Sequence, residues 1–311
     1  MPRAPENIPR RVTVLEVGPR DGLQNERVRL STDEKVDFVS RLVKAGFRHI
    51  EVGSFVHPKW IPQMADTAEV LRRLPKRDDV AYWTLVPNRH GFEAAVAAEA
   101  RHIAVFLSSS ETHNRKNLNR TIDESLEGIE EITVAAASHG MKVRGYVSTV
   151  FGCPYEGPVD FDRVLRIADR LLALGCFQVS LGDTTGMGTP FQVREGSARA
   201  LKAFGSDRIA LHLHDTRGTG LANALAGLEV GITHFDSSVG GMGGCPYAPG
   251  ASGNLGTEDL LYVLQAAGIE TGIDLDQLLS ISQRLEFDHG ATLNSRYYRY
   301  RQTGRPTAWT R

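Results

Sequence analysis

Short runs of β-branched and other apolar residues alternate along the chain with longer stretches whose apolar positions recur at helical spacing. Eight such runs predict strands at residues 12–18, 49–55, 80–86, 102–108, 142–149, 177–183, 209–215 and 234–239. Their separation, roughly 20 to 40 residues, is typical of repeated βα units in a parallel sheet. Eight units suffice to close a (β/α)8 barrel, and a doubly wound open sheet is the alternative.

The stretches between these strands predict helices. The first opens with Ser31 and Glu34 in a capping-box pattern, followed by apolar positions at helical spacing. Further helices are predicted at about 88–99, 122–138, 160–174, 189–203, 220–230 and 257–267, and several of them end at a glycine. We therefore expect one catalytic domain over residues 1–311, with the barrel at about 12–270 and a short C-terminal extension of helix and tail at about 271–311.

The end of the chain differs in composition from the rest. After about residue 290 it is basic and aromatic, and no acidic residue follows. We expect a loosely held tail, with contact to substrate phosphates or to a neighbouring subunit as the alternatives.

Composition narrows the classes of partner. Lys and Arg total 36 and Asp and Glu total 37, so the net charge of −1 provides no field that would attract nucleic acid. No apolar run approaches the roughly 20 residues that span a bilayer, and the first residues lack the apolar core of a signal peptide. We expect a cytoplasmic protein without nucleic-acid or membrane partners. The three cysteines have no metal-finger spacing.

The seventh predicted strand carries two histidines. In the segment IALHLHD, His212 and His214 are two residues apart, so both side chains point to the same side of the strand. Burying two imidazoles without hydrogen-bond partners would cost on the order of 1 to 3 kcal/mol each. A metal that both rings bind removes this cost, whereas a single inward histidine is more often a core residue.

Further ligands are expected at other strand ends, where barrel enzymes have their active sites. The turn GPRDG after the first strand provides Asp21 as an oxygen ligand, with Arg20 beside it. The glycine-rich loop after the eighth strand contains Cys245 and Asn254, and Asn254 could complete a mixed nitrogen and oxygen site suited to Mg²⁺ or Mn²⁺. The alternatives are that Asp21 stabilises its turn and that Asn254 orders its loop.

Three more carboxylates fall where a barrel interior or strand end would bury them. Glu16 lies in the first strand, Glu51 in the second, and Asp183 closes the sixth. Buried acids need partners, which Arg20 and a metal could supply. Each of the three could equally be a structural brace.

Five long motifs resemble 3-hydroxy-3-methylglutaryl-CoA lyase, a family of the aldolase and condensing-enzyme barrel superfamily. They occur in the same order as in the family and span nearly the whole chain. The motifs are EVGPRDGLQNE (16–26), IEVGSFVHPKWIPQM (50–64), LGDTTGMGTP (181–190), HLHDTRG (212–218) and GGCPYAPGASGNLGTED (243–259).

The resemblance implies a role for each matching position. The metal ligands would be Asp21, His212, His214 and Asn254. Arg20 would bind the reacting carbonyl, Glu51 would support the site, Gln24 would line it, and Cys245 would act in a mobile loop. Arg27 stands where the family has a lysine and would meet the phosphates of coenzyme A, for which Lys59, Arg115 and Lys116 are weaker candidates.

The resemblance also implies the reaction. Metal-assisted loss of the substrate's hydroxyl proton to Asp21 or His212 would cleave 3-hydroxy-3-methylglutaryl-CoA to acetoacetate and acetyl-CoA, a step of leucine degradation and ketone body formation. Arg20 would stabilise the enolate. A homodimer is the expectation for the family.

Some positions depart from the family pattern. Arg217 and Thr219 follow the histidines where the family commonly reads HDTYGQ, and Thr149 replaces a residue that is often cysteine. The acyl group could therefore be another 3-hydroxyacyl-CoA dicarboxylate, such as citramalyl-CoA or a longer-branched glutaryl-CoA. An acyl-CoA condensing synthase and a non-catalytic binding protein are two further alternatives.

Overall fold

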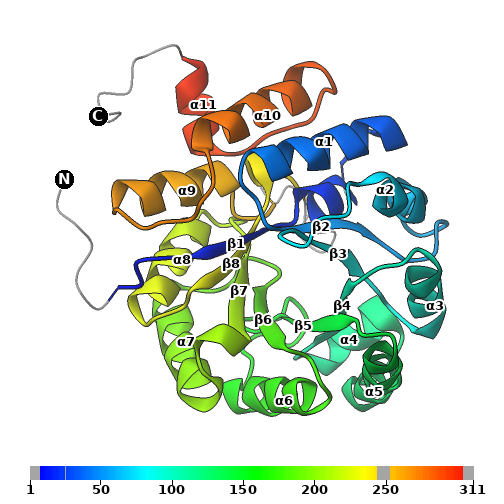
Figure 1. Ribbon diagram of the computed structural model, residues 1–311. Helices are drawn as coiled ribbons and strands as arrows, with labels where there is room; N and C mark the ends of the chain where they lie inside the picture. Colours follow the sequence, from blue (N-terminus) through cyan, green and yellow to red (C-terminus); the bar gives the residue numbers. More distant parts are fainter. Residues whose placement is uncertain (1–7, 25, 244–252, 304–311) are drawn as a thin grey trace.

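The computed structural model describes residues 8–24, 26–243 and 253–303 (Figure 1). Eight parallel strands follow one another around a closed barrel, and β1 pairs with β8. The strands are β1 (Thr13–Glu16), β2 (His49–Ser54), β3 (Ala81–Leu85), β4 (His102–Ser108), β5 (Lys142–Ser148), β6 (Gln178–Asp183), β7 (Ile209–Leu213) and β8 (His234–Ser237). All eight predicted strands are confirmed, although several end earlier than predicted, and the open-sheet alternative is wrong.

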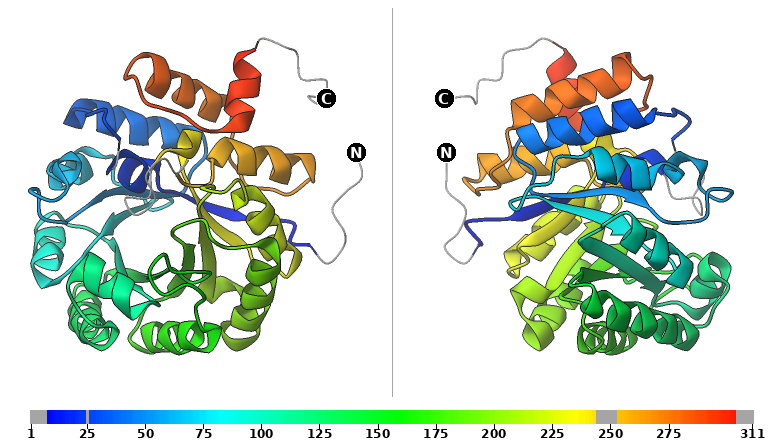
Figure 2. Two further views of the ribbon diagram at one scale, coloured as in Figure 1. Left: turned by 180° about the vertical axis from the view of Figure 1, so that it is seen from behind. Right: turned by 45° about the vertical axis from the view of Figure 1, so that its right-hand side comes forward.

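Helices surround the strands on the outside, as the three views show (Figures 1 and 2). They are α1 (Thr32–Lys44), α2 (Thr67–Arg73), α3 (Arg89–Ala97), α4 (Glu111–Leu118), α5 (Ile122–Ser138), α6 (Phe161–Ala173), α7 (Pro190–Phe204), α8 (Gly220–Glu229), α9 (Thr257–Ala266), α10 (Leu275–Phe287) and α11 (Arg296–Gln302). The sequence analysis missed α2 and α4, because α2 has only seven residues and α4 is strongly polar. In the described part of the chain, no helix is both long and apolar enough to cross a membrane.

Helix α1 illustrates how the local sequence determines an element. The Ser31 side chain accepts a hydrogen bond from the Glu34 backbone, and the Glu34 carboxylate accepts one from the Ser31 backbone, so the predicted capping box is confirmed. The helix ends before Gly46, whose φ is 108° and where a Cβ would lie 2.2 Å from the Gly272 carbonyl oxygen. Only glycine fits this turn without strain.

Apolar packing is divided unequally between the two sides of the strands. One large cluster fills the space between the strands and the surrounding helices. Inside the barrel, the apolar contacts form two small clusters, one around Leu15, Val17 and Trp83 and the other around Leu85, Ala104 and Tyr146. The rest of the interior is therefore available to polar and charged side chains.

The C-terminal extension packs against the barrel more firmly than predicted. Helix α10 lies alongside α1, and α11 packs on α9 (Figure 1). Tyr297 stacks on Tyr262 with ring centroids 4.5 Å apart, and Tyr298 is buried, with its hydroxyl donating to Glu286 at 2.7 Å. The prediction of a loosely held tail is wrong for residues up to 303, because Tyr298 is buried and Tyr297 stacks on α9.

We predict that Tyr298→Ala lowers the free energy of unfolding by about 3 kcal/mol, because it leaves a cavity where a buried ring was packed. Tyr300 is 43% exposed and provides the matched control, for which Tyr300→Ala should change stability by less than about 0.5 kcal/mol. Urea unfolding monitored by circular dichroism measures both. Equal stability of the two variants would contradict the docked position of α11.

Candidate active site

Strand β7 brings two imidazoles to the carboxyl end of the barrel. His212 lies in the strand and His214 follows it, both side chains are buried, and their Nε2 atoms lie 3.2 Å apart. Burial, together with the nearby His212, lowers the pKa of His214 to about 3. His214 is therefore neutral at physiological pH, which leaves a ring nitrogen lone pair for a metal.

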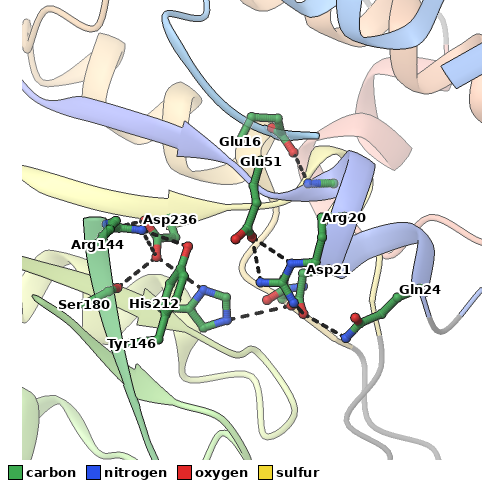
Figure 3. A network of polar contacts seen from close by, with 12 residues as sticks. Glu16, Arg20, Asp21, Gln24, Glu51, Arg144, Tyr146, Ser180, His212 and Asp236 are labelled. Carbon is green, nitrogen blue, oxygen red and sulfur yellow. Dashed lines mark hydrogen bonds and ion pairs between the residues drawn. The ribbon is translucent and has the colours of Figure 1, made fainter. Parts of the chain in front are cut away.

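The turn after β1 directs Asp21 toward these rings. Residues Gly18–Gly22 form a single π-helical turn, in which the backbone N–H groups of Arg20, Asp21 and Gly22 all donate to the Val17 carbonyl. This tight turn places Asp21 Oδ2 3.8 Å from His212 Nε2 (Figure 3). One ligand atom each from Asp21, His212 and His214 lies within 4.8 Å of the other two.

Asn254 provides a fourth donor, because its two side-chain atoms have different surroundings. Its Nδ2 donates to Asp21 Oδ2 at 2.8 Å and to the Met242 carbonyl at 3.0 Å. Its Oδ1 is buried and has no hydrogen-bond partner in the described part of the chain. This orphaned oxygen, one carboxylate and two imidazoles form a donor set that fits a divalent cation.

Arg20 is held beside the cluster by two carboxylates (Figure 3). Its Nε donates to Glu51 Oε2 at 2.7 Å, and its Nη1 pairs with Asp21 Oδ1. Burial alone would lower the pKa of Arg20, but the charges of Asp21 and Glu51 outweigh it and the pKa is raised. Burial would likewise raise the pKa of Asp21, yet Arg20 and the histidines hold it at about 2. Both groups are therefore charged throughout the neutral range.

A cavity of about 740 Å³ opens above these residues. Arg20, Asp21 and Gln24 lie along it with both histidines, and Gln24 Nε2 donates to Asp21 Oδ1 at 3.1 Å. Trp60, Lys116 and Arg120 line its outer part. The site therefore opens into a space that a large ligand with anionic groups could enter.

The predicted coenzyme A contacts differ in their relation to this cavity. Lys116 lines it, whereas Arg27, Lys59 and Arg115 are exposed and lie outside its lining. The sequence analysis did not single out Arg120, which also lines it. Cys245 lies outside the described residues.

Two of the three additional carboxylates act as braces. Glu16 accepts hydrogen bonds from the backbone of Gly18 and Val239 and from the Thr257 hydroxyl, so it ties the loop after β1 to the loop after β8. Asp183 accepts from the backbone of Met187 and Gly188 in the loop after β6. Burial raises the pKa of Glu16 to about 8 and that of Asp183 to about 6. Glu51 instead contacts Arg20.

The positions that depart from the family pattern lie outside the cavity lining. Arg217 donates to the carbonyls of Thr185 and Gly186, and the Thr219 hydroxyl donates to the Gly188 carbonyl. Thr149 has φ 60° and hydrogen bonds with Ser108. None of these three substituted positions lines the cavity.

Sequence reasoning missed a polar group in the barrel below the histidines, formed by Arg144, Tyr146, Ser180 and Asp236 (Figure 3). Arg144 and Tyr146 are two residues apart in β5, so their side chains point to the same side of the strand, and Asp236 lies in β8. The signal was present as charged residues at inward positions of predicted strands.

Comparison with known proteins identifies relatives of the chain. A family model described as HMGL-like matches residues 11–285. The chain is 46% identical over 288 residues to a hydroxymethylglutaryl-CoA lyase of Bacillus subtilis, covering 93% of this chain and 96% of the relative. It is 49% identical over 285 residues to the enzyme of the same name from Pseudomonas mevalonii, covering 92% and 95%.

A solved structure with the same fold contains ligands. It is an HMG-CoA lyase from Acinetobacter baumannii in complex with coenzyme A and 3-methylmalate, and it superimposes with a TM-score of 0.91 at 40% identity. The match covers 99% of each chain.

We predict that Asn254→Ala weakens Mn²⁺ binding at least about tenfold, because it removes the unpartnered oxygen and a hydrogen bond to Asp21. Asn223→Ala is the matched control. Asn223 is also buried and also has an unpartnered Oδ1, but it lies outside the ligand cluster. Electron paramagnetic resonance titration of free Mn²⁺ measures both affinities. Equal losses in the two variants would argue against Asn254 as a ligand.

Proposed function

The chain belongs to the HMGL-like family, and from this premise we propose that it is a divalent-metal-dependent lyase cleaving 3-hydroxy-3-methylglutaryl-CoA to acetoacetate and acetyl-CoA. The observation that carries the proposal is the juxtaposition of the donor set with Arg20 at the base of the large cavity. We further propose that residues 1–311 work as a single catalytic domain, with Asp21, His212, His214 and Asn254 as the metal ligands.

A bound divalent cation would orient the substrate and make its hydroxyl more acidic. The protein must supply a group that accepts the hydroxyl proton. We assign this role to the Asp21 carboxylate, which lies at the cavity beside His212, because the two ring nitrogens of His212 face Asp236 and the cation site.

Arg20 would stabilise the negative charge that develops on the thioester oxygen when the carbon–carbon bond breaks. Glu51 and Asp21 hold its guanidinium in place before the substrate arrives, so little reorganisation is needed during the reaction. Its charge is permanent in the neutral range because the same carboxylates raise its pKa. Glu51 is in this scheme a positioning residue.

The outer part of the cavity suits coenzyme A. Lys116 and Arg120 place positive charge there, and Trp60, which is 82% exposed, offers an aromatic surface. The solved lyase structure with coenzyme A and 3-methylmalate supports an acyl-CoA ligand for this fold. Arg27 stays a predicted phosphate contact, and Cys245 a predicted participant in loop closure or proton transfer.

We keep the methylglutaryl group as the proposed acyl group, because Arg217, Thr219 and Thr149 do not themselves line the cavity. Arg217 and Thr219 contact protein groups outside the lining, whereas Thr149 hydrogen-bonds with Ser148 and Thr184, which line it. Homodimer formation, a cytoplasmic location, the choice between Mg²⁺ and Mn²⁺, and a place in leucine degradation or ketone body formation stay predictions.

We predict that the purified protein releases acetyl-CoA from 3-hydroxy-3-methylglutaryl-CoA with Mg²⁺ or Mn²⁺ and stops when a chelator is added, because the donor set needs a cation. Citramalyl-CoA under the same conditions is the comparison substrate and should react much more slowly. Faster release from citramalyl-CoA would move the proposal to that substrate, and turnover in chelator would contradict the metal-dependent mechanism.

Arg20→Met should lower kcat by about 10² to 10³, because a directed donor to the developing enolate is lost. The variant should still bind Mn²⁺, since Arg20 contributes no ligand atom. Arg194→Met, on the outer surface of α7, is the control and should retain near-normal kcat. A normal kcat for Arg20→Met would remove Arg20 from the mechanism.

A further inference from the structure

A buried ion pair crosses the interior of the barrel beneath the histidines (Figure 3). Arg144 of β5 donates to both oxygens of Asp236 of β8, at 2.8 Å from Nη2 to Oδ1 and 3.1 Å from Nη1 to Oδ2. The two residues are 2% and 1% exposed. A buried pair of this kind is weak support for stability by itself, because both charges lose their hydration. Its surroundings therefore suggest another role.

The Asp236 carboxylate also faces His212. The two residues are directly paired across β7 and β8, and Asp236 Oδ2 lies 3.4 Å from His212 Nδ1. The same oxygen accepts the Ser180 hydroxyl at 2.8 Å. His212 Nδ1 is buried and makes no hydrogen bond of regular geometry in the described part of the chain, and Asp236 is an acceptor within its reach. The ring therefore spans from Asp236 inside the barrel to Asp21 and His214 at its mouth.

Tyr146 restricts the same ring from its side. Its ring meets that of His212 edge to face, with centroids 5.9 Å apart and an interplanar angle of 81°. Arg144 donates to the Tyr146 hydroxyl at 2.8 Å, and its guanidinium lies over the Tyr146 ring at 4.9 Å. Arg144 thus holds both the carboxylate and the aromatic ring that contact His212.

We propose that Asp236 is a positioning residue that accepts the Nδ1 proton of His212 and so keeps Nε2 unprotonated and directed toward the cation site. A neutral imidazole carries one N–H, so a proton on Nε2 would block the lone pair that a metal needs. Arg144 keeps the carboxylate in place. The inference rests on the proposed metal-dependent function, which it deepens by naming the support of one ligand.

The test compares two double variants, because removing one member of a buried ion pair leaves an unpaired charge that could unfold the protein. Arg144→Met/Asp236→Asn keeps an oxygen acceptor for His212, whereas Arg144→Met/Asp236→Leu has nearly the same shape without one. Without substrate, we expect the Asn variant to bind Mn²⁺ within about threefold of the wild-type affinity and the Leu variant to bind about 10- to 100-fold more weakly. Equal affinities in the two variants would overturn the proposal.

Nuclear magnetic resonance of metal-free protein with ¹⁵N-labelled histidine reads the tautomer directly, with His212→Gln used for assignment. We expect a proton on Nδ1 of His212 in the wild type and in Ser180→Ala, which removes one hydrogen bond to Asp236 without touching the ring. A wild-type proton on Nε2 would overturn the proposal even if neither double variant folds. Wild-type protein with the Nδ1 proton and Mn²⁺ binding but no lyase activity would refute the proposed function alone.

Discussion

The need to balance buried charge determines how this barrel interior is built. An unpaired charge inside a protein costs several kcal/mol, so each charged side chain that points inward must meet a partner. Arg144 pairs with Asp236, and Arg20 pairs with both Glu51 and Asp21. Two guanidinium groups thus face three carboxylates. The excess of negative charge and the unpartnered Asn254 oxygen lie together at the barrel mouth, an arrangement that suits a divalent cation.

Features set by the alternation of side chains along a strand, or by a local turn motif, were predictable from the sequence. Alternation along β7 places His212 and His214 on one side of the strand whatever the rest of the fold does, and the GPRDG turn marks the end of β1. The pairing of Arg144 with Asp236 was not predictable in this way, because 92 residues separate them and only barrel closure brings them together. Helix α4 was not predicted because its polar sequence lacks an apolar stripe. The aromatic contacts of α11 were not predicted because the basic composition of the C-terminal extension indicated a loosely held tail.

The catalytic proposal depends on two rigid parts of the structure, the backbone turn after β1 and the side chains that the strands hold below it. The π-helical turn after β1 fixes Arg20 and Asp21 through backbone bonds to one carbonyl, while Glu51 and Asp236 fix side chains from the strands below. Gly18 belongs to the same arrangement, because a Cβ there would lie 2.7 Å from both Glu16 Oε1 and Val239 Cγ1. Polar groups that bind no substrate therefore set the geometry of those that line the cavity.

The brace formed by Glu16 has a consequence for synthesis of the chain. This carboxylate, near the beginning of the chain, takes its partners from Val239 and Thr257, and Asp21 meets His212 only across the closed barrel. During translation, domains begin to fold from their N-terminal part, but these contacts cannot form until the last third of the chain has left the ribosome. Until then Glu16 and Asp21 lack their distant partners, so the candidate metal-ligand set is complete only late in the synthesis of the chain.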